Sequence, residues 1–169
     1  MISVIIPTVD TTTARYINCL ESVARYRGQG QHEIITARFG GTFAENCNEA
    51  ARIAKGDEFL LLNDDVILTG DLFRAFRLVK LNTPGDCIMG ARLFYPDGLV
   101  QHAGIGFDTD GSPYNLWKLA PAEHPEVMKP RFLNAVTFAC ALVARNIWLS
   151  VGGLDEGYRN SYEDVDFCL

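Results

Sequence analysis

The sequence predicts an α/β domain with a mainly parallel central sheet flanked by helices. Short apolar, β-branched runs alternate with longer segments of helical character along the first half of the chain. The chain has 169 residues, of which 48% are hydrophobic, and this suits one domain with a substantial core. Strands that alternate with helices form right-handed βαβ units, and such units build a mainly parallel sheet.

Residues 2–81 follow this alternation closely. Strands are expected at 2–6, which Pro7 stops, at 33–37 and at 59–62. Helices are expected at 11–27, 44–54 and 71–81. One of Thr11, Thr12 and Thr13 would cap the first helix, and Gly56 would end the second.

Residues 87–151 are less regular. Further strands are expected at 87–93 and 134–144, and a short helix at 147–151. The turn signal Tyr95-Pro96-Asp97-Gly98 lies between them. Residues 104–130, rich in Gly, Pro and polar side chains, are expected to form a long loop that is functional or mobile. No repeat or linker divides the chain, so we expect a single domain over residues 1–169.

Composition argues against some partners and locations. A net charge of −6 argues against nucleic acid, which selects basic surfaces. The five widely spaced cysteines form no C-x-x-C pair, and this predicts reduced thiols in a cytoplasmic protein. The sequence has no stretch apolar enough to span a bilayer and no signal-peptide pattern at its start. We therefore expect a cytoplasmic protein, and leave peripheral membrane association and homo-oligomerisation open.

Two acidic clusters carry the chemical prediction. The apolar run 59–62 ends in Asn63-Asp64-Asp65, and Glu163-Asp164-Val165-Asp166 lies near the other end of the chain. In an open α/β sheet, ligands bind beyond the carboxyl ends of the strands. Acids at that edge can hold a hard divalent cation beside substrate phosphates. One cluster could therefore hold a metal ion while the other moves a proton.

A series of short segments along the chain is recognisable by its order and spacing. The segments are VIIPT at 4–8, FAENCN at 43–48, AKGD at 54–57, LNDDV at 62–66, DGLVQHAG at 97–104, VGGLDE at 151–156 and YEDVD at 162–166. Together they resemble the family 2 glycosyltransferases of GT-A type, and the last three resemble members that build bacterial surface polysaccharides. The resemblance implies a Rossmann-like GT-A domain, with residues 1–93 as its nucleotide-binding half and 94–169 as its acceptor-side half. It also implies inverting, metal-dependent transfer of a sugar from a nucleoside-diphosphate sugar to a saccharide or lipid-linked acceptor.

The resemblance assigns a metal site to Asn63-Asp64-Asp65, the position of the family's D-x-D motif. Asp65 would bind Mn²⁺ or Mg²⁺ directly, with Asp64 as the second candidate ligand. Asp64 or Asn63 would otherwise reach the ribose or a metal-bound water. The cation would offset the negative charge that the departing nucleoside diphosphate gains. The alternative is a plain turn at the end of a strand, because Asn and Asp favour turns.

The resemblance makes Asp164 the base that removes the proton from the acceptor hydroxyl. Glu163 would hold an acceptor hydroxyl or orient the base, and repulsion among the carboxylates could raise one pKa. The same residues also fit a plain helix start, in which Ser161 caps the helix and acids occupy its first turn. Both interpretations can hold together, because a cap fixes the position of the helix that carries Asp164.

The nucleotide is expected at the end of the first strand, at Pro7 and Thr8. Relatives carry an acid after the second strand that reads the nucleobase, whereas this sequence has Arg38 there. Arg can donate a hydrogen bond or pair with phosphate, but it cannot accept one from an imide. Asp10 is expected to take over part of that recognition. The chain also ends at Leu169, earlier than relatives do, so we expect either a fragment or a compact member.

Four further features each allow two interpretations. His102 could face a ligand, or it could be a structural residue in a Gly-flanked turn. Asn48 corresponds to a family position near the nucleotide, or it satisfies a nearby backbone group. Tyr114 and Trp117 could stack on a sugar ring or anchor the long loop. Gly152-Gly153 could bring backbone amides to the diphosphate or end a helix.

Two other functions remain as alternatives. A nucleotidyltransferase would also hold Mg²⁺ with acids on a doubly wound sheet, but residues 9–13 lack the Gly-rich phosphate loop expected there. A non-catalytic nucleotide-sugar-binding module would be a degenerate or truncated transferase. Arg38 and the early end favour such a module, whereas Asp65 and Asp164 oppose it.

Overall fold

The computed structural model describes residues 1–26, 28, 30–159 and 161–169. Within these residues, the central sheet has the strand order β2-β1-β3-β9-β4. β1 pairs in parallel with β2 and β3, and β9 runs antiparallel to both β3 and β4. The prediction of an α/β domain with a mainly parallel sheet is therefore confirmed. The bounds of these strands are Ile2–Pro7 for β1, His32–Ala37 for β2, Glu58–Leu62 for β3, Met89–Gly90 for β4 and Cys140–Ala144 for β9.

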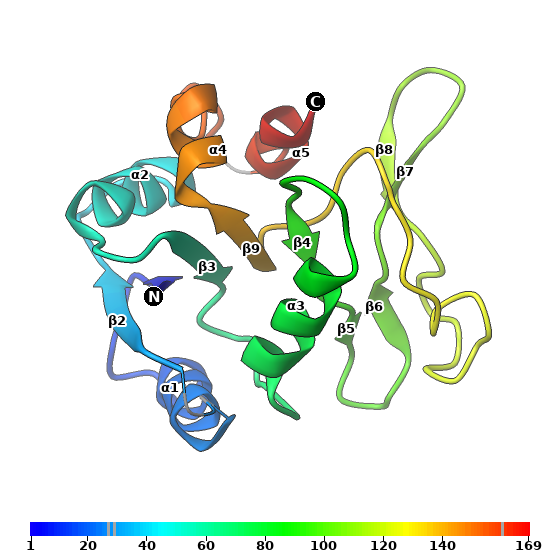
Figure 1. The fold of residues 1–169 in the computed structure, drawn as a ribbon, viewed down its shortest axis with the longest axis horizontal. Helices are drawn as coiled ribbons and strands as arrows, with labels where there is room; N and C mark the ends of the chain where they lie inside the picture. The colour runs from blue at the N-terminus through cyan, green and yellow to red at the C-terminus, as the bar shows by residue number, and fades with distance from the viewer. Residues whose placement is uncertain (27, 29, 160) are drawn as a thin grey trace.

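Helices cover both faces of this sheet (Figure 1). Successive residues of β1 point to opposite faces: Val4 and Ile6 pack with α1 and α3, whereas Ile5 packs with α2, α4 and α5. Because both faces are covered, the inner strands β1, β3 and β9 are mostly apolar, whereas the edge strand β2 also carries polar residues. One layer consists of α1 (Ala14–Tyr26) and α3 (Leu72–Leu81), and the other of α2 (Phe43–Ile53), α4 (Arg145–Val151) and α5 (Glu163–Cys168).

Polar side chains fix where the helices begin. Thr42 and Glu45 form a reciprocal capping box at the start of α2. Asp71 caps α3 by accepting a hydrogen bond from the Arg74 amide. At α1 the Tyr16 amide donates to Thr13 Oγ1, so Thr13 is the one of the three predicted threonines that lies at the helix start. The predicted end of this helix, at residue 27, lies outside the described residues.

The predicted strand at 87–93 is wrong, because the chain forms two short strands in different sheets. β4 joins the central sheet, and β5 (Leu93–Phe94) pairs instead with β6 (Val100–His102). The strand leaves the central sheet just after Gly90, where a Cβ would lie 2.7 Å from the Val136 side chain. The predicted turn at 95–98 joins β5 to β6, with the Gly98 amide donating to the Tyr95 carbonyl.

The segment 104–130 is not a continuous loop as predicted. It contains an antiparallel hairpin of β7 (Ile105–Phe107) and β8 (Pro113–Asn115), which lies beside the β5–β6 hairpin (Figure 1). The sequence pattern did not predict this pairing, because Gly106 and Pro113 are poor strand formers. A Cβ at Gly106 would lie 2.8 Å from the Tyr114 ring, so a larger residue there would have to displace that ring. The predicted strand at 134–144 is shorter, and only Cys140–Ala144 belongs to the central sheet.

The topology creates one edge suited to a ligand. The chain runs from β1 outward to β2 and then returns to β3 on the other side of β1. The carboxyl ends of β1 and β3 therefore form the point where strand order reverses, which is where open α/β sheets bind ligands. β9 is antiparallel, so residues 137–139, which precede it, lie at this same edge.

Two expectations from composition can be compared with the structure. All five cysteines are free thiols, and burial raises the pKa of Cys19 and Cys140 to about 12. Among the residues described, every helix is too short or too polar to traverse a bilayer.

Candidate active site

The ends of β1 and β3 are joined by a buried carboxylate. Thr8 Oγ1 donates a hydrogen bond of 2.6 Å to Asp64 Oδ2, and Arg15 Nε lies 3.3 Å from Asp64 Oδ1. Asp64 is only 9% exposed. A buried carboxylate needs such partners, because an unpaired charge in the interior is costly. Asp64 therefore holds β1, β3 and the first turn of α1 together.

Asp65 has a different environment from its neighbour, because it is exposed. The described residues contain no group of three or more His, Cys, Asp or Glu side chains that could hold a metal ion. Mg²⁺ is commonly held by one or two carboxylates together with substrate phosphates and water. An exposed Asp65 beside the anchored Asp64 fits a site of that kind.

The second acid cluster begins α5 in an unusual way. Ser161 and Tyr162 both have left-handed backbones, with φ of 76° and 75°. Tyr162 is the N-cap and makes no side-chain capping bond, so the predicted Ser161 cap is wrong. Ser161 precedes the N-cap residue Tyr162 by one position, so it does not occupy the position that caps α5. Left-handed non-glycine residues are strained and cluster at functional sites, and here they bring Glu163 and Asp164 into the first turn of α5.

Asp164 is held by two backbone amides. The Phe138 amide donates to Asp164 Oδ2 at 3.1 Å, and the Val165 amide donates to Oδ1 at 2.9 Å. Phe138 lies two residues before β9, so this hydrogen bond connects α5 to the edge of the sheet. The carboxylate thus has a fixed orientation beside residues 137–139.

Glu163 is more buried than Asp164 and lacks a partner at one oxygen. Glu163 is 7% exposed, and its Oε2 makes no hydrogen bond. Burial raises the pKa of Glu163 above its ordinary value, and the nearby Asp164 adds to this effect. Glu163 is thus a carboxyl group kept away from water with an unused acceptor.

One cavity brings the two clusters together. Its volume is about 240 Å³, close to the lower limit of about 300 Å³ for small-molecule sites. In the described part of the chain, the buried side-chain polar atoms without a hydrogen bond are Asn63 Oδ1 and Glu163 Oε2, and both residues line this cavity. Orphaned buried acceptors are uncommon and call for a partner, so the cavity is suited to a ligand that donates hydrogen bonds. The lining consists of Phe43, Asn63, Thr137, Phe138, Ala139, Ser161, Tyr162, Glu163 and Asp164.

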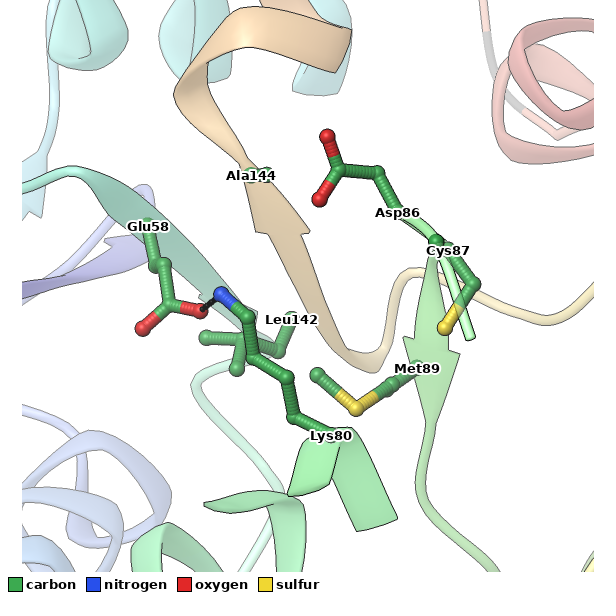
Figure 2. A pocket seen from close by; sticks show the side chains of 8 residues that line it. Glu58, Lys80, Asp86, Cys87, Met89, Leu142 and Ala144 are labelled. Carbon is green, nitrogen blue, oxygen red and sulfur yellow. Dashed lines mark hydrogen bonds and ion pairs between the residues drawn. The ribbon is translucent and has the colours of Figure 1, made fainter. Parts of the chain in front are cut away.

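A second hollow lies at the opposite edge of the sheet and has no comparable chemistry. Figure 2 shows Lys80 reaching from α3 to Glu58, the first residue of β3. The hollow has a volume of about 10 Å³, which is at the lower limit for a single water molecule. The Glu58–Lys80 pair is therefore a contact between α3 and the sheet rather than a binding site.

The residues expected to bind the nucleotide lie at the ligand edge, with one exception. Pro7 ends β1 and Thr8 follows it. Asp10 Oδ1 accepts hydrogen bonds from the Thr12 amide and hydroxyl, and these bonds lower the pKa of Asp10. Arg38 is exposed just after β2 and acts electrostatically on Asp10. A cation and an anion therefore occupy the outer end of this edge.

Asn48 is the exception, because its hydrogen bonds are used within the protein. It is 8% exposed; its Nδ2 donates to the Leu154 carbonyl and to Glu156 Oε1, and its Oδ1 accepts from the Leu154 amide. This matches the structural role that the sequence left open. Gly152 and Gly153 also have a structural role, since both amides donate to the Trp148 carbonyl and end α4.

The aromatic residues of the 104–130 segment anchor that segment. The Arg131 guanidinium lies over the Trp117 ring, 4.2 Å from its centroid. Tyr114 packs over Gly106 in the β7–β8 hairpin and is 48% exposed. Neither residue lines the cavity.

Sequence reasoning missed Arg15 and the wall formed by residues 137–139. Arg15 had a signal, because a cation in the first turn of a helix is opposed by the helix dipole and needs another reason to be there. Residues 137–139 had none, because their role depends on backbone amides rather than on side-chain chemistry.

Comparison with known proteins identifies the fold. No protein-family model matches the sequence. The structure matches the catalytic domain of Drosophila β1,4-galactosyltransferase 7, solved with xylobiose, at a TM-score of 0.55 and 15% identity, over 99% of this chain and 58% of that chain. It matches residues 1–349 of Staphylococcus aureus TarS at a TM-score of 0.55 and 13% identity, over 99% of this chain and 53% of that chain. The fold is that of a GT-A-like glycosyltransferase catalytic domain.

Two curated sequences are similar to part of the chain. Uncharacterized protein y4gI of Sinorhizobium fredii is 33% identical over 127 residues, which are 72% of this chain and 14% of that protein. O-antigen biosynthesis protein RfbC of Myxococcus xanthus is 30% identical over 129 residues, which are 72% of this chain and 10% of that protein. The chain therefore matches only a small part of each of these longer proteins.

Proposed function

We propose that this chain is a glycosyltransferase domain that moves a sugar from a nucleoside-diphosphate sugar to a saccharide or lipid-linked acceptor, with inversion and with a divalent cation. The observation that carries the proposal is the cavity shared by Asn63 at the end of β3 and by Glu163 and Asp164 of α5. The GT-A-like fold and the similarity to an O-antigen biosynthesis protein support it. TarS, which has the same type of fold, has been solved in complex with UDP-GlcNAc.

The donor would lie across the ends of β1 and β3, where the topology favours a ligand. Asp65, with Asp64 behind it, would hold Mn²⁺ or Mg²⁺. A bound cation would supply charge neutralisation at the diphosphate as it leaves. Thr8 and Arg15 keep Asp64 in place, and Arg38 and Asp10 are available to the nucleotide at the outer end of the edge.

The acceptor would occupy the side of the cavity formed by α5. Asp164 would take the proton from the attacking hydroxyl, while the oxygen of that hydroxyl displaces the nucleoside diphosphate from the opposite face of the sugar. Such proton transfer contributes about 10²–10⁴-fold to a rate. Asn63 Oδ1 and Glu163 Oε2 would accept hydrogen bonds from sugar hydroxyl groups, which would supply the donors that both atoms lack.

A binding module without catalysis is the second candidate. Arg38, exposed where relatives have an acid that reads the base, favours it. Both oxygens of Asp164 also accept backbone hydrogen bonds, which leaves fewer lone pairs for a substrate. Such a module would bind a nucleotide but would not release it from its sugar conjugate.

Calorimetric titration separates these candidates. UDP, GDP and dTDP are titrated into the protein, each with Mn²⁺ and with EDTA, and the sugar conjugate of the nucleotide that binds is then tested for turnover. Metal-dependent binding with turnover supports the transferase, and binding without turnover supports the module. If none of the three nucleotides binds in the presence of Mn²⁺, both proposals fail.

A further inference from the structure

His102 lies at the end of β6, is only 2% exposed, and links two other segments of the chain. Its Nδ1 lies 2.7 Å from Asn115 Oδ1, at the end of β8. Its Nε2 accepts a hydrogen bond from the Thr137 amide at 3.4 Å. Thr137 lines the cavity of the candidate active site, whereas His102 does not.

These contacts fix the protonation of the ring. A backbone amide can only donate, so Nε2 must keep its lone pair toward Thr137. In a neutral imidazole the proton then resides on Nδ1, where it is donated to Asn115 Oδ1. A second proton, on Nε2, would point toward the N–H of Thr137, so two hydrogen-bond donors would face each other. Burial favours the same state and lowers the pKa of His102 below 6.5, while Asn115 and the charge of Asp164 act in the opposite direction.

The Thr137 amide that His102 holds is next to the amide that holds Asp164. Thr137 donates to His102 Nε2, and Phe138 donates to Asp164 Oδ2 at 3.1 Å. The Ala139 amide in turn donates to Thr137 Oγ1 at 3.3 Å. Three consecutive residues of the cavity wall are therefore fixed by hydrogen bonds, and one peptide unit separates the His102 contact from the Asp164 contact.

We propose that His102 is a positioning residue, which as the neutral Nδ1–H tautomer fixes the wall at residues 137–139 and thereby holds Asp164 in its working orientation. This inference rests on the proposed function, because Asp164 is assigned as the base there. Asp164 is the charged group in the described structure that acts on the ring. Protonation of His102 breaks the Thr137 contact and frees the wall, so the site loses its geometry as the pH falls through the pKa of His102, which burial lowers from its ordinary value.

Two conservative substitutions separate the contacts of the ring. In His102→Gln, the amide oxygen can reach the place of Nε2 and accept from Thr137. In His102→Asn, the amide nitrogen can replace Nδ1 and donate to Asn115, but nothing accepts from Thr137. We expect His102→Gln to keep turnover near that of the wild type, and His102→Asn to lower kcat by about 10²-fold, as expected for a misplaced catalytic group. The KM for the donor stays unchanged in both.

The pH profile adds a second readout. The wild type is expected to lose kcat as the pH falls through the lowered pKa of His102. In His102→Gln, which has no ring to protonate, this loss is expected to be absent. Equal loss of kcat in the two variants would overturn the inference, because a purely structural ring would not distinguish them. An acid limb that is identical in wild type and His102→Gln would overturn it as well.

Nitrogen-15 NMR of the wild type tests the inference without any turnover. The ring is expected to show a protonated Nδ1 and an unprotonated Nε2, and the Phe138 amide to exchange faster with solvent in His102→Asn than in His102→Gln. A proton on Nε2, or equal exchange at Phe138, would overturn the inference. If the wild type shows this tautomer and the two variants differ in Phe138 exchange as expected, but the wild type has no turnover, the positioning of the wall is supported. In that case only the proposed function has failed.

Discussion

At the scale of single residues, the site depends on two neighbouring carboxyl groups in different surroundings. Asp164 is oriented by two backbone amides, whereas Glu163 is buried with one oxygen unpartnered. Environments that separate two carboxyl groups in this way commonly give them different chemical roles. The arrangement favours Asp164 as the group that takes a proton and Glu163 as the group that binds a hydroxyl.

Asp164→Asn tests the first role. The amide cannot accept the proton, so turnover is expected to fall by about 10²–10⁴-fold, measured as release of nucleotide from the sugar conjugate. Asp166→Asn is the matched control, because Asp166 is exposed on the same helix and, among the described residues, its side chain accepts a hydrogen bond from the Tyr158 hydroxyl rather than from the cavity wall. Comparable losses in both variants would contradict the assignment of the base.

Glu163→Gln tests the burial of the second carboxyl group. Because the pKa of Glu163 is raised in the folded state, its contribution to stability is complete below about pH 4.3, the pKa in the unfolded chain, and is lost as the pH rises through the folded value. The neutral Gln avoids this loss. We expect Glu163→Gln to raise Tm at pH 7, by about 2–4 °C for each 1 kcal/mol of destabilisation that it removes, and to show no advantage at pH 4. A lower Tm at pH 7 would contradict this account.

At the scale of elements, the second acid cluster is positioned by contacts far apart in the sequence. Asn48 of α2 holds the segment that follows α4 through three hydrogen bonds to Leu154 and Glu156. Gly153 permits this approach, because a Cβ there would lie 2.5 Å from Asn48 Oδ1. The chain continues from this segment to α5, which begins seven residues after Glu156, so α2 helps to place Glu163 and Asp164.

Asn48→Ala tests this link between elements. The substitution leaves the buried Leu154 amide and carbonyl without partners, so the free energy of unfolding is expected to fall by about 1–3 kcal/mol. Urea denaturation measures this change. Asn146→Ala is the control, because Asn146 is exposed and its side chain donates to Asp86 at the surface; a change within about 0.5 kcal/mol is expected there. Equal effects of the two substitutions would show that Asn48 does not brace this segment.

Sequence patterns predicted some of these elements and not others. β1, β2, β3 and the three helices between and after them were predicted, because each has enough residues to show its period. β5 to β8 were missed, since strands of two or three residues carry no period, and β7 and β8 also contain Gly106 and Pro113. Their pairing depends on neighbours that only the folded chain supplies.

At the scale of the whole molecule, one cavity is lined by residues from both acidic segments of the sequence. The meeting of Asn63 with Glu163 and Asp164 in one cavity fits the motif resemblance, although no local pattern required it. The use of Asp64 as an internal brace was not predictable, because its partners Thr8 and Arg15 lie about fifty residues away in sequence. Asp65 does not line the cavity itself, and lies two residues beyond Asn63, which does.

The central claim is that the end of β3 and the first turn of α5 face one bound ligand. Paramagnetic broadening by Mn²⁺ in nitrogen-15 NMR spectra tests it directly, in the presence of the nucleoside diphosphate that binds. Mn²⁺ is expected to broaden the amide signals of Asn63, Phe138 and Asp164 but not those of residues 85–87 at the opposite edge, and Asp65→Asn is expected to abolish the broadening. Broadening that spares Phe138 and Asp164, or that persists in Asp65→Asn, would contradict it.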